Sequence, residues 1–119
     1  MKIYVSHSRD FDFNQDLYIP IRMSDLNNQF NFFLPHEDGK SVDTKEIIQN
    51  SDLILAEVSF PSTGQGIELG WANIFKIPIL CVSKENTKIS GSLKYLTQDF
   101  ITYSDSKDLI NKIRIFLNK

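Results

Sequence analysis

The sequence predicts an α/β protein, a three-layer sandwich of the flavodoxin-like, Rossmann type with a five-stranded, mainly parallel sheet. Two observations lead to this prediction. Short apolar segments alternate with helical patterns along the whole chain, and several of these segments are apolar at nearly every position. Strands buried on both faces have this composition, because helices cover both sides of a parallel sheet. Right-handed crossovers are then expected between successive strands.

Five short segments are the predicted strands, namely Ile3–Ser6, Phe30–Leu34, Leu53–Val58, Ile77–Val82 and Phe100–Tyr103. The segments 53–58 and 79–82 are apolar nearly throughout, which is typical of strands covered on both faces. These two segments are therefore expected to be fully buried.

Helical patterns lie between the strands. The first has i, i+4 apolar spacing, and Pro20 is expected to kink or shorten it. The run 43–46 (Asp-Thr-Lys-Glu) predicts the capped start of a second helix. A third helix is predicted over Gly66–Phe75, and a last one after the capping residues Ser104–Ser106. The apolar positions of the first and last helices are Phe13, Leu17 and Ile21, and Leu109, Ile113, Phe116 and Leu117.

Length and composition indicate one globular domain spanning residues 1–119. The net charge of −2 argues against binding to a nucleic acid polymer, but it does not exclude a small anionic ligand.

Cys81 is the one cysteine, so no intramolecular disulfide or cysteine-based metal cluster is expected, and its apolar surroundings predict a buried thiol. The chain has neither a signal-peptide pattern nor an apolar run of about 20 residues, so we expect a cytoplasmic protein without membrane contact.

Polar side chains follow the predicted strands where each strand ends. These ends carry Ser6-His7-Ser8-Arg9, Pro35-His36-Glu37, residues 59–66 and Ser83-Lys84. Ligands of open α/β sheets bind beyond the carboxyl ends of the strands, so the functional site is expected at this edge. The fold alone does not name the function.

The segment from Ala56 to Ala72 is the main candidate for the functional centre. A loop containing Gly64 and Gly66 is expected before the helix, and the two glycines permit tight turns and close approach of a ligand to the backbone. Glu68 is expected in the first helical turn, where the helix dipole stabilises an ionised carboxylate. Such a carboxylate is either a nucleophile or cation-stabilising group in a cleft, or a residue that only the dipole favours.

The same segment carries a resemblance to a known family. Residues 51–58 (SDLILAEV), Pro61-Ser62 and residues 64–70 (GQGIELG) resemble the motif of the nucleoside 2-deoxyribosyltransferase superfamily. The sequence is most similar to the branch of 2′-deoxynucleoside 5′-monophosphate N-hydrolases. The similarity extends to residues 3–5, 34–36 and 79–81 and to the last helix, and so covers most of the chain.

The resemblance implies cleavage of an N-glycosidic bond, or deoxyribosyl transfer, on a small nucleoside or its 5′-monophosphate, without a cofactor or metal. Glu68 matches the nucleophile that forms a glycosyl-enzyme ester. Tyr4 matches a tyrosine that orients the sugar or the nucleophile, and is otherwise a core aromatic. Ser62 and Ser8 match serines on the phosphate side, although Ser62 has the alternative role of capping a turn. The expected substrate-binding residues are Ser8, Arg9, His36, Ser62, Gly64, Gly66 and Ser92.

Three departures from the family leave questions open. The loop after the first strand lacks glycine and contains Asp10 and Asp12, which repel a phosphate unless they point away, while Arg9 partly offsets them. The family's helical aspartate matches Thr44, with Asp43 one position off, or about 100° around a helix. Asp43 is therefore either a catalytic acid or a helix cap, and His36 or His7 are the alternatives for protonating the leaving base.

The third departure concerns the homodimer that the resemblance implies, in which a serine of the neighbour reaches the phosphate. Ser92 fits this position without a gap, and Ser90 fits with one. Two other classes of function stay open. The first strand is also similar to that of Toll/interleukin-1 receptor domains, some of which cleave NAD, and a non-catalytic nucleotide-binding protein is the third possibility.

Overall fold

The computed structural model describes residues 1–39 and 42–119, and within them it confirms the predicted α/β sandwich. Five strands form one sheet in the order β2-β1-β3-β4-β5, and all four pairs of neighbours are parallel. The strands are β1 (Lys2–His7), β2 (Asn31–Phe33), β3 (Leu53–Glu57), β4 (Ile79–Lys84) and β5 (Phe100–Tyr103). The order reverses direction at β1, so the loops after β1 and β3 open at a topological switch point.

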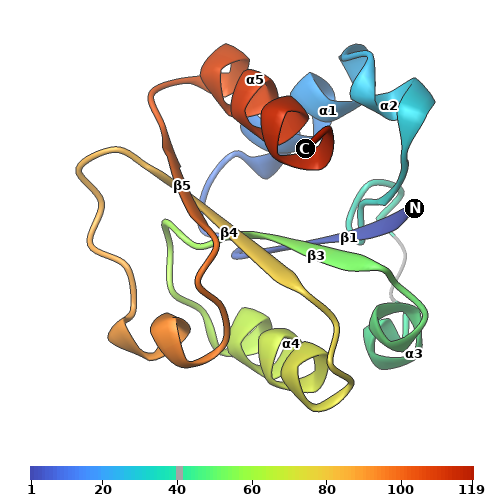
Figure 1. Ribbon diagram of the computed structural model, residues 1–119, viewed down its shortest axis with the longest axis vertical. Helices are drawn as coiled ribbons and strands as arrows, with labels where there is room; N and C mark the ends of the chain where they lie inside the picture. The colour runs from blue at the N-terminus through green and yellow to red at the C-terminus, as the bar shows by residue number, and fades with distance from the viewer. Residues whose placement is uncertain (40–41) are drawn as a thin grey trace.

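Helices cover both faces of the sheet, with α1, α2 and α5 on one side and α3 and α4 on the other (Figure 1). The helices are α1 (Ile19–Met23), α2 (Leu26–Gln29), α3 (Thr44–Gln49), α4 (Thr63–Ile74) and α5 (Ser106–Leu117), with a π-helical turn η1 (Asn14–Tyr18) and a 3₁₀ helix η2 (Gly91–Tyr95). The short helix α2 was not predicted from the sequence.

Strand β1 divides its side chains between two separate apolar clusters. Ile3 and Val5 belong to the cluster under α1 and α5, whereas Tyr4 belongs to the cluster under α3 and α4. This division follows from the two-residue period of a strand, which sends alternate side chains to opposite faces. Cys81 lies in the second cluster with an exposed fraction of 1%, which confirms the predicted buried thiol. Burial raises the pKa of that thiol to about 12.

The fourth strand begins at Ile79, two residues later than predicted. The reason is the end of α4, where Lys76 adopts a φ of 60°. The Ile77 N–H donates to the Ala72 carbonyl (2.9 Å), and the Lys76 N–H donates to the Asn73 carbonyl (3.1 Å). These two bonds form a Schellman motif, which commits Ile77 to closing the helix rather than to the sheet.

The expected disturbance at Pro20 is present as a change of helical register. The Ile19 N–H donates to the Asn14 carbonyl, a spacing of five residues that defines the π-helical turn before α1. Pro20 has no N–H to donate to the carbonyl of Asp16. That carbonyl accepts instead from the Ser106 hydroxyl (3.1 Å), which joins η1 to the start of α5.

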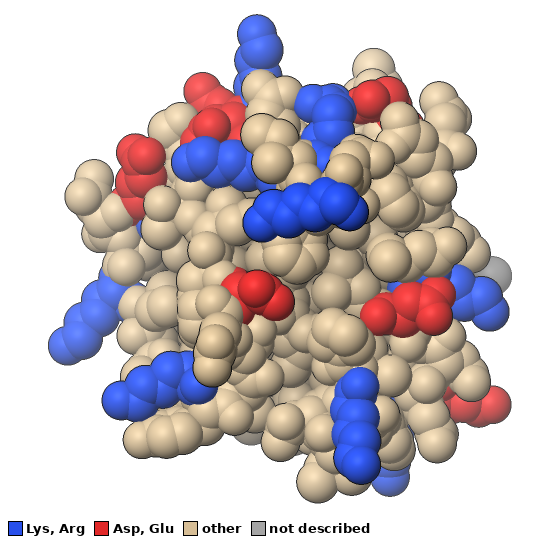
Figure 2. Space-filling model, viewed as in Figure 1, with Lys and Arg blue, Asp and Glu red and all other residues tan. Residues whose placement is uncertain are grey.

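The surface charge is mixed. Figure 2 shows acidic and basic side chains interspersed on one face, without a continuous basic area. Among the described residues, no helix has both the length and the apolar character needed to cross a bilayer.

Truncation of the core is expected to be costly. Leu80 in β4 is completely buried, so Leu80→Ala should lower the free energy of unfolding by about 2–5 kcal/mol through lost apolar burial and a residual cavity. Ile115→Ala removes a side chain that is 65% exposed and should change it by less than about 0.5 kcal/mol. Urea unfolding followed by circular dichroism measures both. Equal decreases in the free energy of unfolding of the two variants would contradict the assignment of Leu80 to the core.

Candidate active site

A cavity of about 460 Å³ opens at the carboxyl ends of the strands, between the loop after β1, the segment after β2 and the starts of α3 and α4. It brings together most of the residues that the sequence singled out. Its lining consists of His7, Ser8, Arg9, Asp10, His36, Thr44, Ser62, Gly64, Gln65, Ile67, Glu68 and Trp71.

Helix α4 begins three residues earlier than predicted, at Thr63. Ser62 is its N-cap, and the Ser62 hydroxyl accepts from the Gln65 N–H at 3.3 Å. Gly64 and Gly66 therefore lie inside the helix, and neither has a positive φ, so the expected tight turn at these glycines is wrong. Glu68 lies in the second helical turn, beyond the turn in which the helix dipole acts strongly.

Two hydroxyl groups of β1 hold the Glu68 carboxylate. The Tyr4 hydroxyl donates to Oε2 at 2.5 Å, and the Ser6 hydroxyl donates to Oε1 at 2.8 Å. Burial, together with the neighbouring charge of Glu68, raises the pKa of Tyr4 far above its ordinary value. Tyr4 therefore keeps its proton and remains a donor.

Ser6 was not singled out from the sequence, and neither was Gln65. The buried Gln65 amide donates to the carbonyl of Ser6 (3.2 Å) and to that of Glu57 (2.8 Å). These bonds tie the ends of β1 and β3 to the first turn of α4. A signal for Ser6 was available, since a residue two positions after Tyr4 in a strand shares its face.

A chain of hydrogen bonds fixes the protonation of His7. Its Nδ1 donates to the Ser8 carbonyl (2.7 Å), because a carbonyl oxygen only accepts, and its Nε2 lies 2.6 Å from the Tyr18 hydroxyl. Burial lowers the pKa of His7 to about 4, so Nε2 accepts from Tyr18. Both ring nitrogens are thus engaged in the neutral form, which excludes His7 as the group that protonates a leaving base.

His36 presents a different environment. Its backbone N–H donates to the Tyr18 hydroxyl (3.0 Å), while its half-buried ring lines the cavity. Partial burial and the charge of Arg9 lower the pKa of His36, and the charge of Glu68 opposes them. Among the described residues, no side chain forms a hydrogen bond with the His36 ring nitrogens, so they are available to a ligand.

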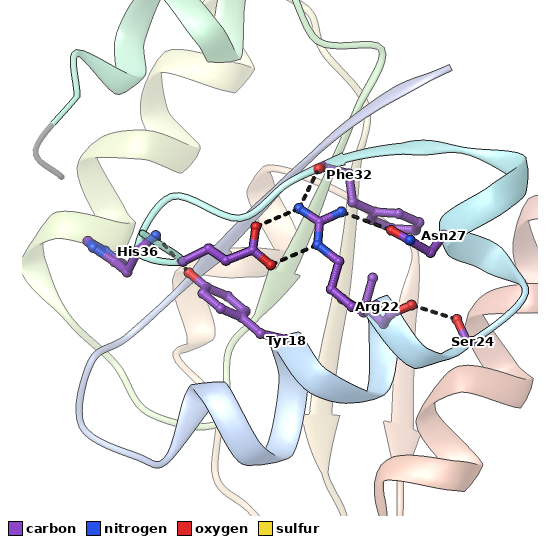
Figure 3. A network of polar contacts seen from close by, with 8 residues as sticks. Tyr18, Arg22, Ser24, Asn27, Phe32 and His36 are labelled. Carbon is purple, nitrogen blue, oxygen red and sulfur yellow. Dashed lines mark hydrogen bonds and ion pairs between the residues drawn. The ribbon is translucent and has the colours of Figure 1, made fainter. Parts of the chain in front are cut away.

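An ion pair anchors the segment that carries His36. Figure 3 shows the Arg22 guanidinium between the Asn27 side chain, the Phe32 carbonyl and a carboxylate. That carboxylate belongs to Glu37, whose two oxygens accept from Arg22 at 2.8 and 2.9 Å. Although both partners are partly exposed, the bidentate geometry and the two further bonds hold the segment after β2 against α1.

Other expected site residues lie elsewhere. Asp43 caps α3, accepting from the Lys45 N–H at 3.1 Å, and Thr44 rather than Asp43 lines the cavity. Gly66 and Ser92 line a smaller cavity of about 210 Å³, which also contains Ser90 and shares only Ser62 and Gln65 with the first. Ser90 caps η2 by accepting from the Ser92 N–H.

A second carboxylate, Glu57, is buried at the end of β3 outside the cavity lining. It accepts from the Ser59 N–H (2.6 Å), the Ser59 hydroxyl (2.9 Å) and the Tyr103 hydroxyl. The Ser59 hydroxyl in turn accepts from the Lys84 N–H (2.8 Å). This network joins the ends of β3, β4 and β5 and fixes the path of the chain toward α4. Within the described part of the chain, no three His, Cys, Asp or Glu side chains are placed to hold a metal ion.

Fold and site define an α/β protein in which two hydroxyl groups hold the carboxylate of Glu68 in a strand-end cavity. No family model matches the chain. A putative 2′-deoxynucleoside 5′-phosphate N-hydrolase of Methanosarcina mazei is 41% identical over 45 residues, which are 38% of this chain and only 28% of that protein.

Solved structures share the fold. The structure of a Clostridium botulinum CMP N-glycosidase has a TM-score of 0.67 at 18% identity, covering 96% of this chain and 99% of that one. A 2-desoxiribosyltransferase from Leishmania mexicana has a TM-score of 0.56 at 19% identity, covering 69% of this chain and 63% of that one. Together with the 45-residue match, these structures confirm the resemblance to the nucleoside 2-deoxyribosyltransferase superfamily.

The protonation of His7 leads to a testable pH dependence. A folded-state pKa of about 4 lies below the ordinary value of 6.5, so His7 stabilises the fold fully above pH 6.5. This contribution, about 3 kcal/mol, should be lost as the pH falls from 6.5 through 4. His7→Gln should therefore unfold more easily at pH 7 but lose less stability over this window. Urea midpoints at a series of pH values measure the difference between wild type and variant, and a constant difference would exclude the neutral histidine. His36→Gln, at a half-buried position, should reduce the pH dependence of the free energy of unfolding less than His7→Gln does.

Proposed function

We propose that the protein cleaves the N-glycosidic bond of a small nucleoside or nucleotide, by hydrolysis or by transfer of the sugar, with Glu68 as the nucleophile. The observation that carries this proposal is the Glu68 carboxylate, which two hydroxyl donors orient toward a cavity of about 460 Å³. The relatives support it, since they are named as an N-hydrolase, an N-glycosidase and a deoxyribosyltransferase.

The proposed reaction has two steps. A Glu68 oxygen attacks the anomeric carbon while the bond from that carbon to the base nitrogen breaks, which forms a glycosyl ester and releases the base. Water, or a second base in a transfer reaction, then attacks the same carbon and frees the carboxylate. Tyr4 and Ser6 orient the carboxylate throughout. Because they are neutral donors, they leave its negative charge available to an oxocarbenium-like transition state.

His36 is the proposed source of the proton for the leaving base. Thr44 lines the cavity and matches the family's aspartate by the resemblance, but it has no acidic group, and the Asp43 carboxylate is committed to capping α3. The His36 ring lines the cavity with both nitrogens available. The proton given to the base returns from the attacking water to His36 in the second step.

Further parts of the proposal rest on the resemblance. The resemblance implies a homodimer in which Ser92 or Ser90 of the neighbour reaches the ligand. We further propose a cytoplasmic location, as the sequence pattern leads us to expect. The Toll/interleukin-1 receptor-like alternative has no support among the relatives.

Base release tests the reaction directly. The protein is incubated with deoxynucleosides, their 5′-monophosphates, ribonucleotides and NAD, and free base is measured by chromatography. Glu68→Gln preserves the shape of the side chain and should lower kcat by at least about 1000-fold, because an amide is not a nucleophile. Glu85→Gln makes the same change at an exposed position and should match the wild type. Base release that survives in Glu68→Gln would remove Glu68 from the nucleophile role.

The two hydroxyl donors can be removed one at a time. Tyr4→Phe and Ser6→Ala each delete one hydrogen bond to Glu68 and should lower kcat by about 10- to 100-fold, since a misplaced nucleophile loses its attack geometry. KM should change less than kcat. Tyr95→Phe, at a position that is 78% exposed, is the matched control. Wild-type kcat in both Tyr4→Phe and Ser6→Ala would show that Glu68 needs neither donor.

A further inference from the structure

We propose that Asp10 makes the cavity select against a 5′-phosphate, so that its substrates are nucleosides rather than nucleotides. This inference rests on the proposed function and narrows its substrate class. It assigns to Asp10 the role of a specificity-determining residue, which sets this chain apart from relatives named for a 5′-phosphate or for CMP.

The position of Asp10 answers the question that the sequence left open. Asp10 and Arg9 both line the cavity that contains Glu68. Both aspartates are exposed, but Asp12, two residues further along the same loop, does not line the cavity and accepts from the Gln15 N–H (3.1 Å) at the start of η1. Of the two aspartates, only Asp10 is placed to act on a ligand beside Glu68.

The loop around Asp10 is firmly anchored. The Asp10 N–H donates to the Ser8 hydroxyl (3.0 Å), and the Ser8 carbonyl accepts from His7 (2.7 Å). On the other side, the Phe11 ring stacks on Phe60 with centroids 5.1 Å apart and planes 16° apart. Because the neighbours of Asp10 are held on both sides, the backbone of Asp10 is fixed at the cavity wall.

The charges of the cavity disfavour an anion. Arg9 is the one cationic side chain among the described lining residues, against the two carboxylates of Asp10 and Glu68. The two lining histidines have lowered pKa values, so the neutral form of each predominates at neutral pH and they add little positive charge. A phosphate monoester brings a further charge of about −1.5 to −2.

The start of α4 does not reverse this balance. Ser62 already occupies the N–H groups of Gln65 and Gly66, through its hydroxyl and its carbonyl. The remaining helix dipole is equivalent to about half a positive charge, which is less than the two carboxylates carry. A free 5′-hydroxyl group has no charge, and it can donate a hydrogen bond to the Asp10 carboxylate.

Paired substrates test the inference at constant ionic strength. For one base, kcat/KM is measured on the deoxynucleoside and on its 5′-monophosphate. The wild type should prefer the nucleoside by at least about 10-fold, and Asp10→Asn should shift the ratio toward the monophosphate by at least about 10-fold. Asp12→Asn makes the same charge change two residues away, retains an oxygen for the Gln15 N–H, and should leave the ratio unchanged.

Equilibrium binding supplies a readout that does not need turnover. Calorimetric titration of Glu68→Gln with the same two ligands, with and without Asp10→Asn, measures their affinities. Asp10→Asn should shift the ratio of the two affinities toward the monophosphate. A wild-type preference for the monophosphate, or an equal shift in Asp12→Asn and Asp10→Asn, would overturn the inference. Absence of base release from every substrate would contradict the proposed function instead, and the titrations would then still decide whether Asp10 excludes phosphate.

Discussion

Two hydrogen bonds from β1 to Glu68 join the sheet to α4, and the candidate site depends on them. Tyr4 and Ser6 reach the same carboxylate because they are two residues apart in a strand and leave the same face of the sheet. Val5 and His7 point to the other face, toward the α1 and α5 side. A slip of β1 by one residue against β3 would exchange the two sets, so the register that pairs Tyr4 with Ile54 is a condition for the site as well as for the core.

Neutral groups surround the carboxylate more closely than cations do. Hydroxyl groups contact both oxygens of Glu68, and behind them a neutral His7 is held between Tyr18 and a backbone carbonyl. Neutral donors fix the orientation of a carboxylate without pairing its charge. Such an arrangement suits a reaction in which positive charge develops on a sugar, and it suits a bound phosphate poorly. The position of Asp10 in the cavity lining follows the same electrostatic logic.

Much of this architecture was predictable because it depends on local patterns. All five predicted strands are present, with no end shifted by more than two residues, and Glu68 does lie in a strand-end cavity. The start of α4 was misplaced because glycine favours loops, whereas here Ser62 caps a helix that contains Gly64 and Gly66. Ser6 was not singled out because its partner is 62 residues away, and the strand pattern shows only that Ser6 shares a face with Tyr4. The choice between Asp43 and Thr44 likewise needed the actual path of the chain into α3.

The buried thiol of β4 has a consequence for how the molecule opens. Cys81 lies opposite Ala56 of β3, inside the layer that α4 covers, and its raised pKa leaves almost no thiolate at neutral pH. A thiol reagent therefore modifies the native protein only when β4 separates from its covering helix. The rate of Cys81 alkylation therefore measures how often this region opens. The thiol thus serves as an internal probe of local unfolding in the half of the molecule that holds Glu68.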